Sequence, residues 1–188
     1  MNTPSSSSSS SDDDALWTRA VTLDDLNALR DGNMTGRLGI EFTEIGADFL
    51  RATMPVDERT RQPLGQLHGG ASVALAETLG SLAAHCCLPE GRAGVGIEVN
   101  ANHVRAVRSG HVVGTARPVH VGRSTQVWQI RITTGEEAAR LVCQSRLTLA
   151  VVENGGVADG SADGGRRSPQ EHSVASAPSA ADGGRSLR

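Results

Sequence analysis

Glu77 is the only residue with a full charge in the apolar run GQLHGGASVALAETLGS, residues 65–81. Burying a carboxylate without a partner is strongly unfavourable. No Lys or Arg lies between Gly69 and Cys87, so on a helix Glu77 has no oppositely charged neighbour three or four residues away. Two interpretations are open: a partner from another element or from solvent at a helix end, or a carboxylate kept in a cleft as a general base or nucleophile.

The residues around Glu77 favour the second interpretation when they are taken together. Ser81 lies four residues further on, so its hydroxyl shares the face of Glu77 and could orient the carboxylate or a water molecule. His68 and Gly69 stand where the helix should begin, and the free N–H groups at a helix start can hold an oxyanion. The amide of Gln62 is a further polar group within reach. Taken singly, His68 could be a capping histidine and Gly69 a simple turn residue.

A metal site on the same stripe is not expected. Glu77, Ser81 and His85 follow one another at four-residue spacing, but serine is not a strong zinc ligand and the set lacks the usual three or four donors.

Periodicity and turn residues predict an α+β domain. The segment 22–30 should form a short helix with Thr22 as its N-cap and Gly32 just past its end. A long helix is expected from Gly69 to about Cys87. Alternating apolar and polar residues predict a hairpin from 40–45 and 49–56, and four later strands at 95–104, 111–121, 124–133 and 139–152. The expected arrangement is one antiparallel sheet wrapped about one buried helix.

Composition bounds the rest of the chain. Of its 188 residues 38% are hydrophobic and only 2% aromatic, so the core must be built from Val, Leu, Ile and Ala. A net charge of −3 gives no general affinity for nucleic acid. Residues 1–14 and 153–188 have too few large apolar side chains to fold and are expected to be disordered tails around a domain at 15–152.

The cysteines and the absence of a signal-like or membrane-spanning pattern predict the cellular compartment. Three cysteines without disulfide or zinc spacing are expected to be reduced and mostly buried. The polar, acidic N-terminus does not resemble a signal peptide, and the apolar stretch 69–88 carries too many polar residues for a membrane span. We therefore expect a cytoplasmic protein with no membrane partner.

The segments QPLGQLHGGASVALAETLGS, VGIEVNANHVR and HVGRSTQVWQI, in this order, resemble the hotdog-fold acyl-CoA thioesterases. Within that family they are similar to the branch with 1,4-dihydroxy-2-naphthoyl-CoA hydrolase and 4-hydroxybenzoyl-CoA thioesterase. The resemblance runs from about residue 20 to residue 152. It implies a hotdog fold and hydrolysis of an aromatic or other bulky acyl-CoA without a metal or organic cofactor.

The resemblance also implies residue roles. Glu77 would attack the thioester carbonyl or activate water, and the Gly69 N–H would bind the oxyanion. Gln62 and His68 would position the acyl thioester, with Ser81 close to the carboxylate. The residues implied for binding of substrate and coenzyme A are Gly96, His103, Val104, Arg105, Ala106, His120, Val121, Gly122, Arg123, Ser124 and Thr125.

Arg105 and Arg123 have the chemistry to bind phosphate oxygens, although an Arg beside a strand is often an ordinary surface charge. Substrate-facing variation is expected at Leu64, Leu82 and His85, where His85 replaces an aromatic residue of similar proteins.

An oligomer is expected from geometry as well as from the resemblance. Gly69 and Glu77 are eight residues apart, which is about 12 Å along a helix, so one carbonyl cannot contact both. A two-fold dimer with antiparallel helices would place Glu77 of one chain beside Gly69 of the other, and the resemblance implies a homodimer or tetramer with such shared sites. Two other functions are open: a dehydratase or hydratase of the same fold, in which a histidine moves the proton, and a non-catalytic acyl-CoA-binding module.

Overall fold

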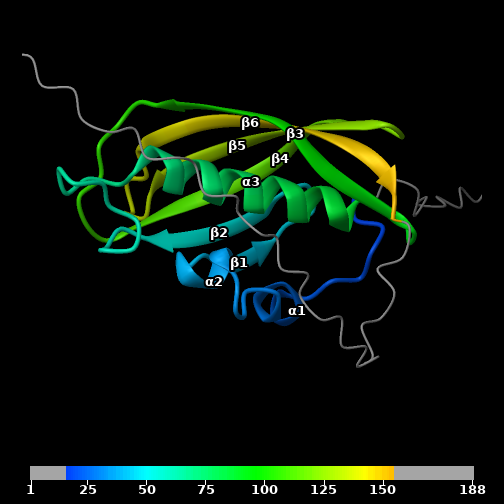
Figure 1. Ribbon diagram of the computed structural model, residues 1–188, viewed down its shortest axis with the longest axis horizontal. Coiled ribbons are helices and arrows are strands. Elements are labelled where there is room, and N and C mark those ends of the chain that lie inside the picture. The colour runs from blue at the N-terminus through cyan, green and yellow to red at the C-terminus, as the bar shows by residue number, and fades with distance from the viewer. Residues whose placement is uncertain (1–15, 155–188) are drawn as a thin grey trace, which may run out of the picture. The chain divides into compact units, whose positions relative to one another are not determined.

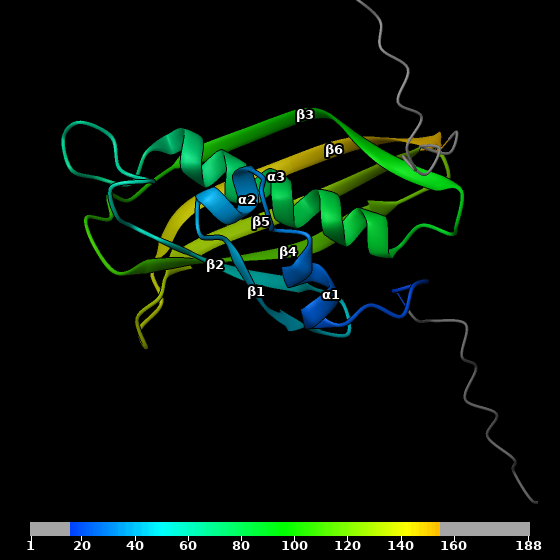
Figure 2. The ribbon, with the colours of Figure 1, turned by 60° about the horizontal axis from the view of Figure 1, so that its bottom comes forward.

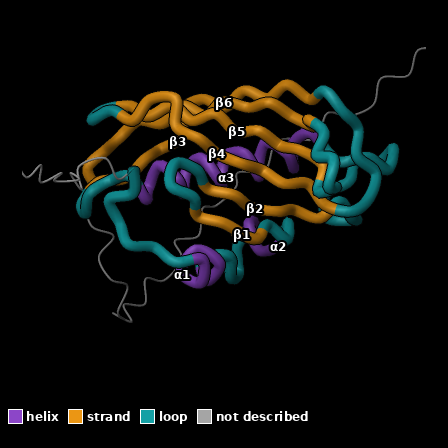
Figure 3. The backbone as a smooth tube through the Cα atoms, turned by 180° about the vertical axis from the view of Figure 1, so that it is seen from behind, coloured by secondary structure: helices purple, strands orange, loops and turns teal. Residues whose placement is uncertain are grey.

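A computed structural model of the chain describes residues 16–154, and in them one six-stranded antiparallel sheet curves around one long helix. The order across the sheet is β1-β2-β4-β5-β6-β3. Figure 1 shows the helix α3 lying across one face, and Figure 3 shows the opposite face of the sheet. The strands are β1 (Glu41–Ile45), β2 (Leu50–Pro55), β3 (Arg92–His103), β4 (His111–Val121), β5 (Thr125–Thr134) and β6 (Leu141–Glu153). The predicted hotdog arrangement is confirmed.

The helix α3 (Gly69–Cys86) packs closely on the sheet because small residues meet large ones at the contact. A Cβ at Gly80 would lie 2.6 Å from Leu147 on β6, and one at Gly114 on β4 would lie 2.5 Å from Leu79. Both glycines therefore let the helix approach the sheet where a larger residue would force them apart. The buried residues of α3 are Ala71, Ser72, Leu75, Ala76, Leu79, Gly80, Ala83, Ala84 and Cys86.

Two short helices lie beside α3 at the β1 end of the sheet (Figure 2). In α1 (Leu23–Ala28) the predicted cap is confirmed: Thr22 and Asp25 form a reciprocal capping box, and the pKa of the Asp25 carboxyl is lowered by its hydrogen bonds with Thr22. The sequence reading missed α2 (Met34–Arg37). Four residues are too short to show helical periodicity, and the signal that was available was Asn33, whose side chain accepts from the N–H groups of Thr35 and Gly36.

The core lies between α3 and the sheet and is largely aliphatic, as composition predicted. Its largest member is Trp128, which is fully buried and stacks on Trp17 with ring centroids 6.3 Å apart. No helix within 16–154 is long and apolar enough to cross a membrane.

Most of the two predicted tails lies outside the described residues. The boundary at residue 153 was set too early, because Glu153 ends β6 and the Asn154 N–H donates to the Gly91 carbonyl.

The strand β3 forms one edge of the sheet and pairs only with β6 among the described strands. Two apolar side chains of this strand are exposed, since Val95 is 50% exposed and Ile97 is 63% exposed. The pairing with β6 is irregular between Gly96 and Glu98. A long edge strand with exposed apolar side chains is a surface on which another strand can pair.

Candidate active site

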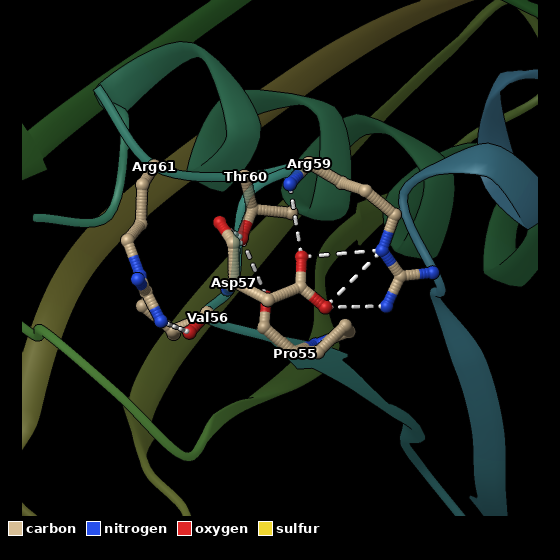
Figure 4. Close-up of polar contacts among 6 residues, drawn as sticks. All are labelled: Pro55, Val56, Asp57, Arg59, Thr60 and Arg61. Carbon is tan, nitrogen blue, oxygen red and sulfur yellow. Dashed lines mark hydrogen bonds and ion pairs between the residues drawn. The ribbon is translucent and has the colours of Figure 1, made fainter. Parts of the chain in front are cut away.

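The loop 56–68 carries Gln62 and His68 and is fixed by hydrogen bonds at its start (Figure 4). Thr60 is 1% exposed; its hydroxyl donates to the Pro55 carbonyl at 2.7 Å and accepts from the Asp57 N–H at 3.1 Å. The Thr60 carbonyl in turn accepts from the His68 N–H at 2.8 Å. A buried side chain with all its hydrogen bonds made thus holds the residue that begins α3.

Two arginines complete this loop. Arg59 pairs with the Asp57 carboxylate, which lowers the pKa of that carboxyl, and Arg61 donates to the Val56 carbonyl at 3.0 Å. Both contacts lie in the same turn, so the path of the chain from β2 to α3 is set before the site residues are reached (Figure 4).

A pocket of about 430 Å³ opens at the N-terminus of α3, and we call it the Gly69 pocket. Within residues 16–154 the Gly69 N–H has no acceptor, as expected of the first donor of a helix. The His103 ring covers Gly69 so closely that a Cβ there would lie 2.9 Å from its Nε2. The pocket is lined by Gln62, Gln66, Leu67, Gly69, Ser72, His103, Val104, Arg105, Ala106 and Val142. The structure therefore brings Gln62, Gly69 and the segment 103–106 together.

His68 is the N-cap of α3, so the capping interpretation is correct for its ring. Its Nδ1 accepts from the Gly70 N–H at 2.8 Å, and this leaves the proton of the neutral ring on Nε2, where it can be donated. The Gln62 side-chain oxygen accepts from the Leu64 N–H. This contact directs the Gln62 amide nitrogen, a donor, away from the turn.

Glu77 is exposed in the single chain, so the prediction that the whole helix is buried was wrong. The sheet covers only one side of α3, and Glu77 lies on another side, next to β3. A Cβ at Gly96 would lie 2.8 Å from Glu77 Oε1. Ser81 is half-buried, and no hydrogen bond joins its hydroxyl to Glu77 among the described residues. On its other flank Glu77 borders a groove of about 190 Å³ with Met34, Thr35, Leu38, Ile40, Ala74 and Thr78.

The loop 120–125 lies at the other end of α3 from the Gly69 pocket. Gly122 and Arg123 line a hollow of about 390 Å³ together with Cys87 and Leu88, which follow the helix. Arg92, at the start of β3, donates to the Arg123 carbonyl at 3.0 Å. One chain therefore does not bring the loop 120–125 to the segment 103–106, and Gly96 lies between the two along β3.

Sequence reasoning missed several residues of the Gly69 pocket. Ser72 is buried, and its position three residues after Gly69 on the helix was a usable signal. Gln66, Leu67 and Val142 gave none, because their place depends on how the loop and β6 meet. Another hollow, of about 610 Å³, lies on the sheet face opposite α3 and is lined mainly by Thr and Arg side chains. It contains none of the predicted site residues.

Comparison with known proteins places these observations in a family. The family model described as the thioesterase superfamily matches residues 64–140. The chain is 54% identical over 137 residues to 1,4-dihydroxy-2-naphthoyl-CoA hydrolase of Escherichia coli K12, covering 73% of this chain and 99% of that protein. It is 51% identical to the proofreading thioesterase EntH of Cronobacter turicensis, with 73% and 98% covered.

Solved structures agree with these relatives. A thioesterase from Haemophilus influenzae matches with a TM-score of 0.72 and 52% identity, over 76% of this chain and 99% of that chain. A thioesterase from Pseudomonas aeruginosa matches with a TM-score of 0.71 and 47% identity, over 73% and 99% of the two chains.

Proposed function

The chain belongs to the thioesterase superfamily, and from this premise we propose that it hydrolyses acyl-CoA thioesters whose acyl group is aromatic or otherwise bulky. The observation that carries the proposal is that the helix α3 presents both a free N–H at Gly69 and an exposed carboxylate at Glu77. These are the two groups that thioester hydrolysis needs, an oxyanion donor and an attacking or proton-accepting group. The names of the relatives in Escherichia coli and Cronobacter support the thioester class.

The following roles are proposed for the site residues. The substrate carbonyl oxygen accepts the Gly69 N–H, and the Gln62 amide and the His68 Nε2–H donate to the acyl thioester. Glu77 either takes a proton from water as the water oxygen attacks the carbonyl carbon, or attacks that carbon itself to give an anhydride that water then cleaves. In both routes the carbon–sulfur bond breaks and the coenzyme leaves as its thiol after protonation.

Glu77 and Gly69 of one chain are too far apart to act on one carbonyl, because eight residues of helix span about 12 Å. The free edge of β3 supports a two-fold symmetric dimer. Antiparallel pairing of two β3 edges would satisfy the backbone N–H and C=O groups along this edge and lay the two α3 helices antiparallel. Glu77 lies beside Gly96, near the middle of β3, and so faces the N-terminal half of the other α3 helix.

The same pairing assembles the coenzyme site. Antiparallel β3 strands bring the Arg92 end of one strand to the His103 end of the other. Arg92 holds the loop 120–125 through the Arg123 carbonyl, so this loop approaches the segment 103–106 of the second chain. Arg105 and Arg123 then flank one groove, where both guanidinium groups can bind the phosphates of coenzyme A.

The test is thiol release from benzoyl, 4-hydroxybenzoyl, dihydroxynaphthoyl, phenylacetyl and fatty acyl-CoA, followed with a free-thiol reagent. Glu77→Ala and Glu77→Gln should lower turnover by about 10² or more, in the range for loss of a catalytic acid–base group. The matched control is Glu90→Ala, an exposed carboxylate in the turn after α3, which should leave turnover and melting temperature unchanged. Turnover close to normal in both Glu77 variants would rule out the proposed mechanism.

The same assay, with an enoyl-CoA and a hydroxyacyl-CoA added to the panel, separates the other two functions. A dehydratase or hydratase would change the acyl chain of an enoyl- or hydroxyacyl-CoA without releasing thiol. A binding module would retain acyl-CoA and release nothing. Either result with a folded wild-type chain would contradict the proposed hydrolysis.

A further inference from the structure

The segment 16–21 crosses the C-terminal end of α3 and is tied to it. The N–H groups of Thr18 and Arg19 both donate to the Cys86 carbonyl, at 2.9 and 3.2 Å. Trp17 anchors the segment, because its ring nitrogen donates to the Gly46 carbonyl at 2.7 Å and its ring stacks on the buried Trp128. Arg19 is thus held at a fixed place beside the last turn of the helix.

The Arg19 guanidinium makes four contacts. Its Nε donates to the Leu88 carbonyl at 2.7 Å, and its Nη2 donates to the carbonyls of Pro89 at 3.0 Å and Arg92 at 3.4 Å. Its Nη1 lies 3.0 Å from His85 Nε2. The three carbonyls fix the plane of the guanidinium, and this orientation directs the Nη1–H at the imidazole.

This contact determines where the proton of His85 sits. Arginine is only a donor, so His85 Nε2 must accept, and the proton of the neutral ring is on Nδ1. Desolvation and the charge of Arg19 both lower the pKa of His85, which agrees with a neutral ring. Within residues 16–154 the Nδ1–H has no hydrogen-bond partner, and the side chain is half-buried. His85 therefore presents one oriented donor.

The His85 side chain lies on the same face of α3 as Glu77. Ser81 and His85 follow Glu77 at four and eight residues, on the same face of α3. Both Glu77 and His85 lean toward the helix N-terminus, so their functional groups stay about 12 Å apart along the axis. An acyl group that lies along the helix axis contacts Glu77 at one end and His85 at the other, each at about 3 Å. Subtracting these two contacts from about 12 Å leaves about 6 Å between its reacting carbon and the oxygen that accepts from His85. One aromatic ring with an oxygen para to the carbonyl has this reach.

We propose that His85 is a specificity-determining residue whose Nδ1–H binds an oxygen at the far end of the acyl group, and that Arg19 is a positioning residue that fixes its tautomer. The inference rests on the proposed function and adds the side chain that distinguishes an acyl group with a ring hydroxyl from one without it. A plain aromatic or alkyl group leaves the donor unpaired, which raises the free energy of the transition state for that substrate.

The experiment compares kcat/KM for 4-hydroxybenzoyl-CoA and benzoyl-CoA, which differ by one hydroxyl. The wild-type ratio should be about 3- to 10-fold in favour of the hydroxylated ester, the value of one hydrogen bond. His85→Phe should bring the ratio to about one. His85→Asn, whose amide N–H can replace the Nδ1–H, should retain most of it. Because the ratio is taken within each variant, a general loss of stability or expression cancels.

Arg19→Met should lower the ratio toward one, whatever happens to the turnover of the two esters taken singly; where this variant does not fold, the two His85 variants decide. A ratio in His85→Phe equal to that of the wild-type chain overturns the inference, as does a wild-type ratio near one. Absence of thiol release from both esters by the wild-type chain instead overturns the proposed function, and the inference with it.

Discussion

Gly96 is the residue of β3 that sets the position of the Glu77 carboxylate, and Gly96→Ala should reveal this. The new Cβ would lie 2.8 Å from Glu77 Oε1, whereas an ordinary contact is about 3.5 Å. The carboxylate must therefore move by about 0.7 Å, which the flexible end of a glutamate side chain can do without disturbing the fold. A displacement of about 1 Å can cost about 10² in rate, so we expect kcat to fall by about 10-fold or more.

The assay is thiol release under saturating acyl-CoA, with circular dichroism and melting temperature as checks on folding. KM should change little, because the segment 103–106 and the loop 120–125 lie away from this contact. Gly94→Ala is the control on the same strand: its Cβ would meet Leu149 at 3.3 Å and Ala84 at 3.6 Å, both apolar and neither in the site. It should keep kcat within about 2-fold of the wild-type value, as expected for a residue outside the catalytic geometry.

A folded Gly96→Ala variant with wild-type kcat would refute the reasoning. It would mean that the carboxylate position beside Gly96 is not the one used in turnover. A fall of equal size in Gly94→Ala would also count against it, since the effect would then come from β3 as a whole.

Two further predictions concern assembly and the thiols. Co-expression of a Gln62→Ala/His68→Ala chain with a Glu77→Ala chain should restore activity to about a quarter of wild type, because half of random dimers are mixed and each has one intact site; verified mixed dimers without activity would contradict the shared site. Burial raises the pKa of Cys87 to about 12 and also raises the pKa values of Cys86 and Cys143. In the unfolded chain a thiol loses its proton at a pKa of about 8.5, whereas the buried thiols keep theirs to higher pH. The stability that they contribute is therefore complete below about pH 8.5 and is lost as pH rises toward 12, so the melting temperature should fall over this range, and less steeply in Cys87→Ala. Equal pH dependence in the two proteins would argue against this assignment.

Local signals explain which parts of the fold were predictable. The Thr22 cap and the hairpin around residues 46–48 are specified by a few neighbouring residues, so α1, β1 and β2 were found at nearly their true bounds. The helix from Gly69 was found for the same reason. The place of β3 at the sheet edge could not be read from chain order, because β3 pairs with β6, its most distant successor, and not with β4.

The candidate site also has parts that the sequence predicted and parts that it could not predict. Gln62, Gly69 and the segment 103–106 line one pocket, and the roles that the resemblance implied for them in catalysis and coenzyme binding stay predictions. The exposure of Glu77 was not predictable from an apolar helix, since it depends on how much of α3 the sheet covers. The Arg19–His85 contact was equally hidden, because it joins residues 66 positions apart through the path of the N-terminal segment.

The exposure of Glu77 answers how a lone carboxylate is tolerated in an apolar helix. In the single chain water solvates it, so folding carries no large desolvation cost. On the proposed two-fold pairing the second chain covers this face, and the cost falls on association, where the pairing of the two β3 edges offsets it. The carboxylate then loses water only as it meets the Gly69 end of the other helix, which is the point at which a desolvated base or nucleophile is useful. An apolar helix with one charge is thus consistent with a fold whose active site is completed by its partner.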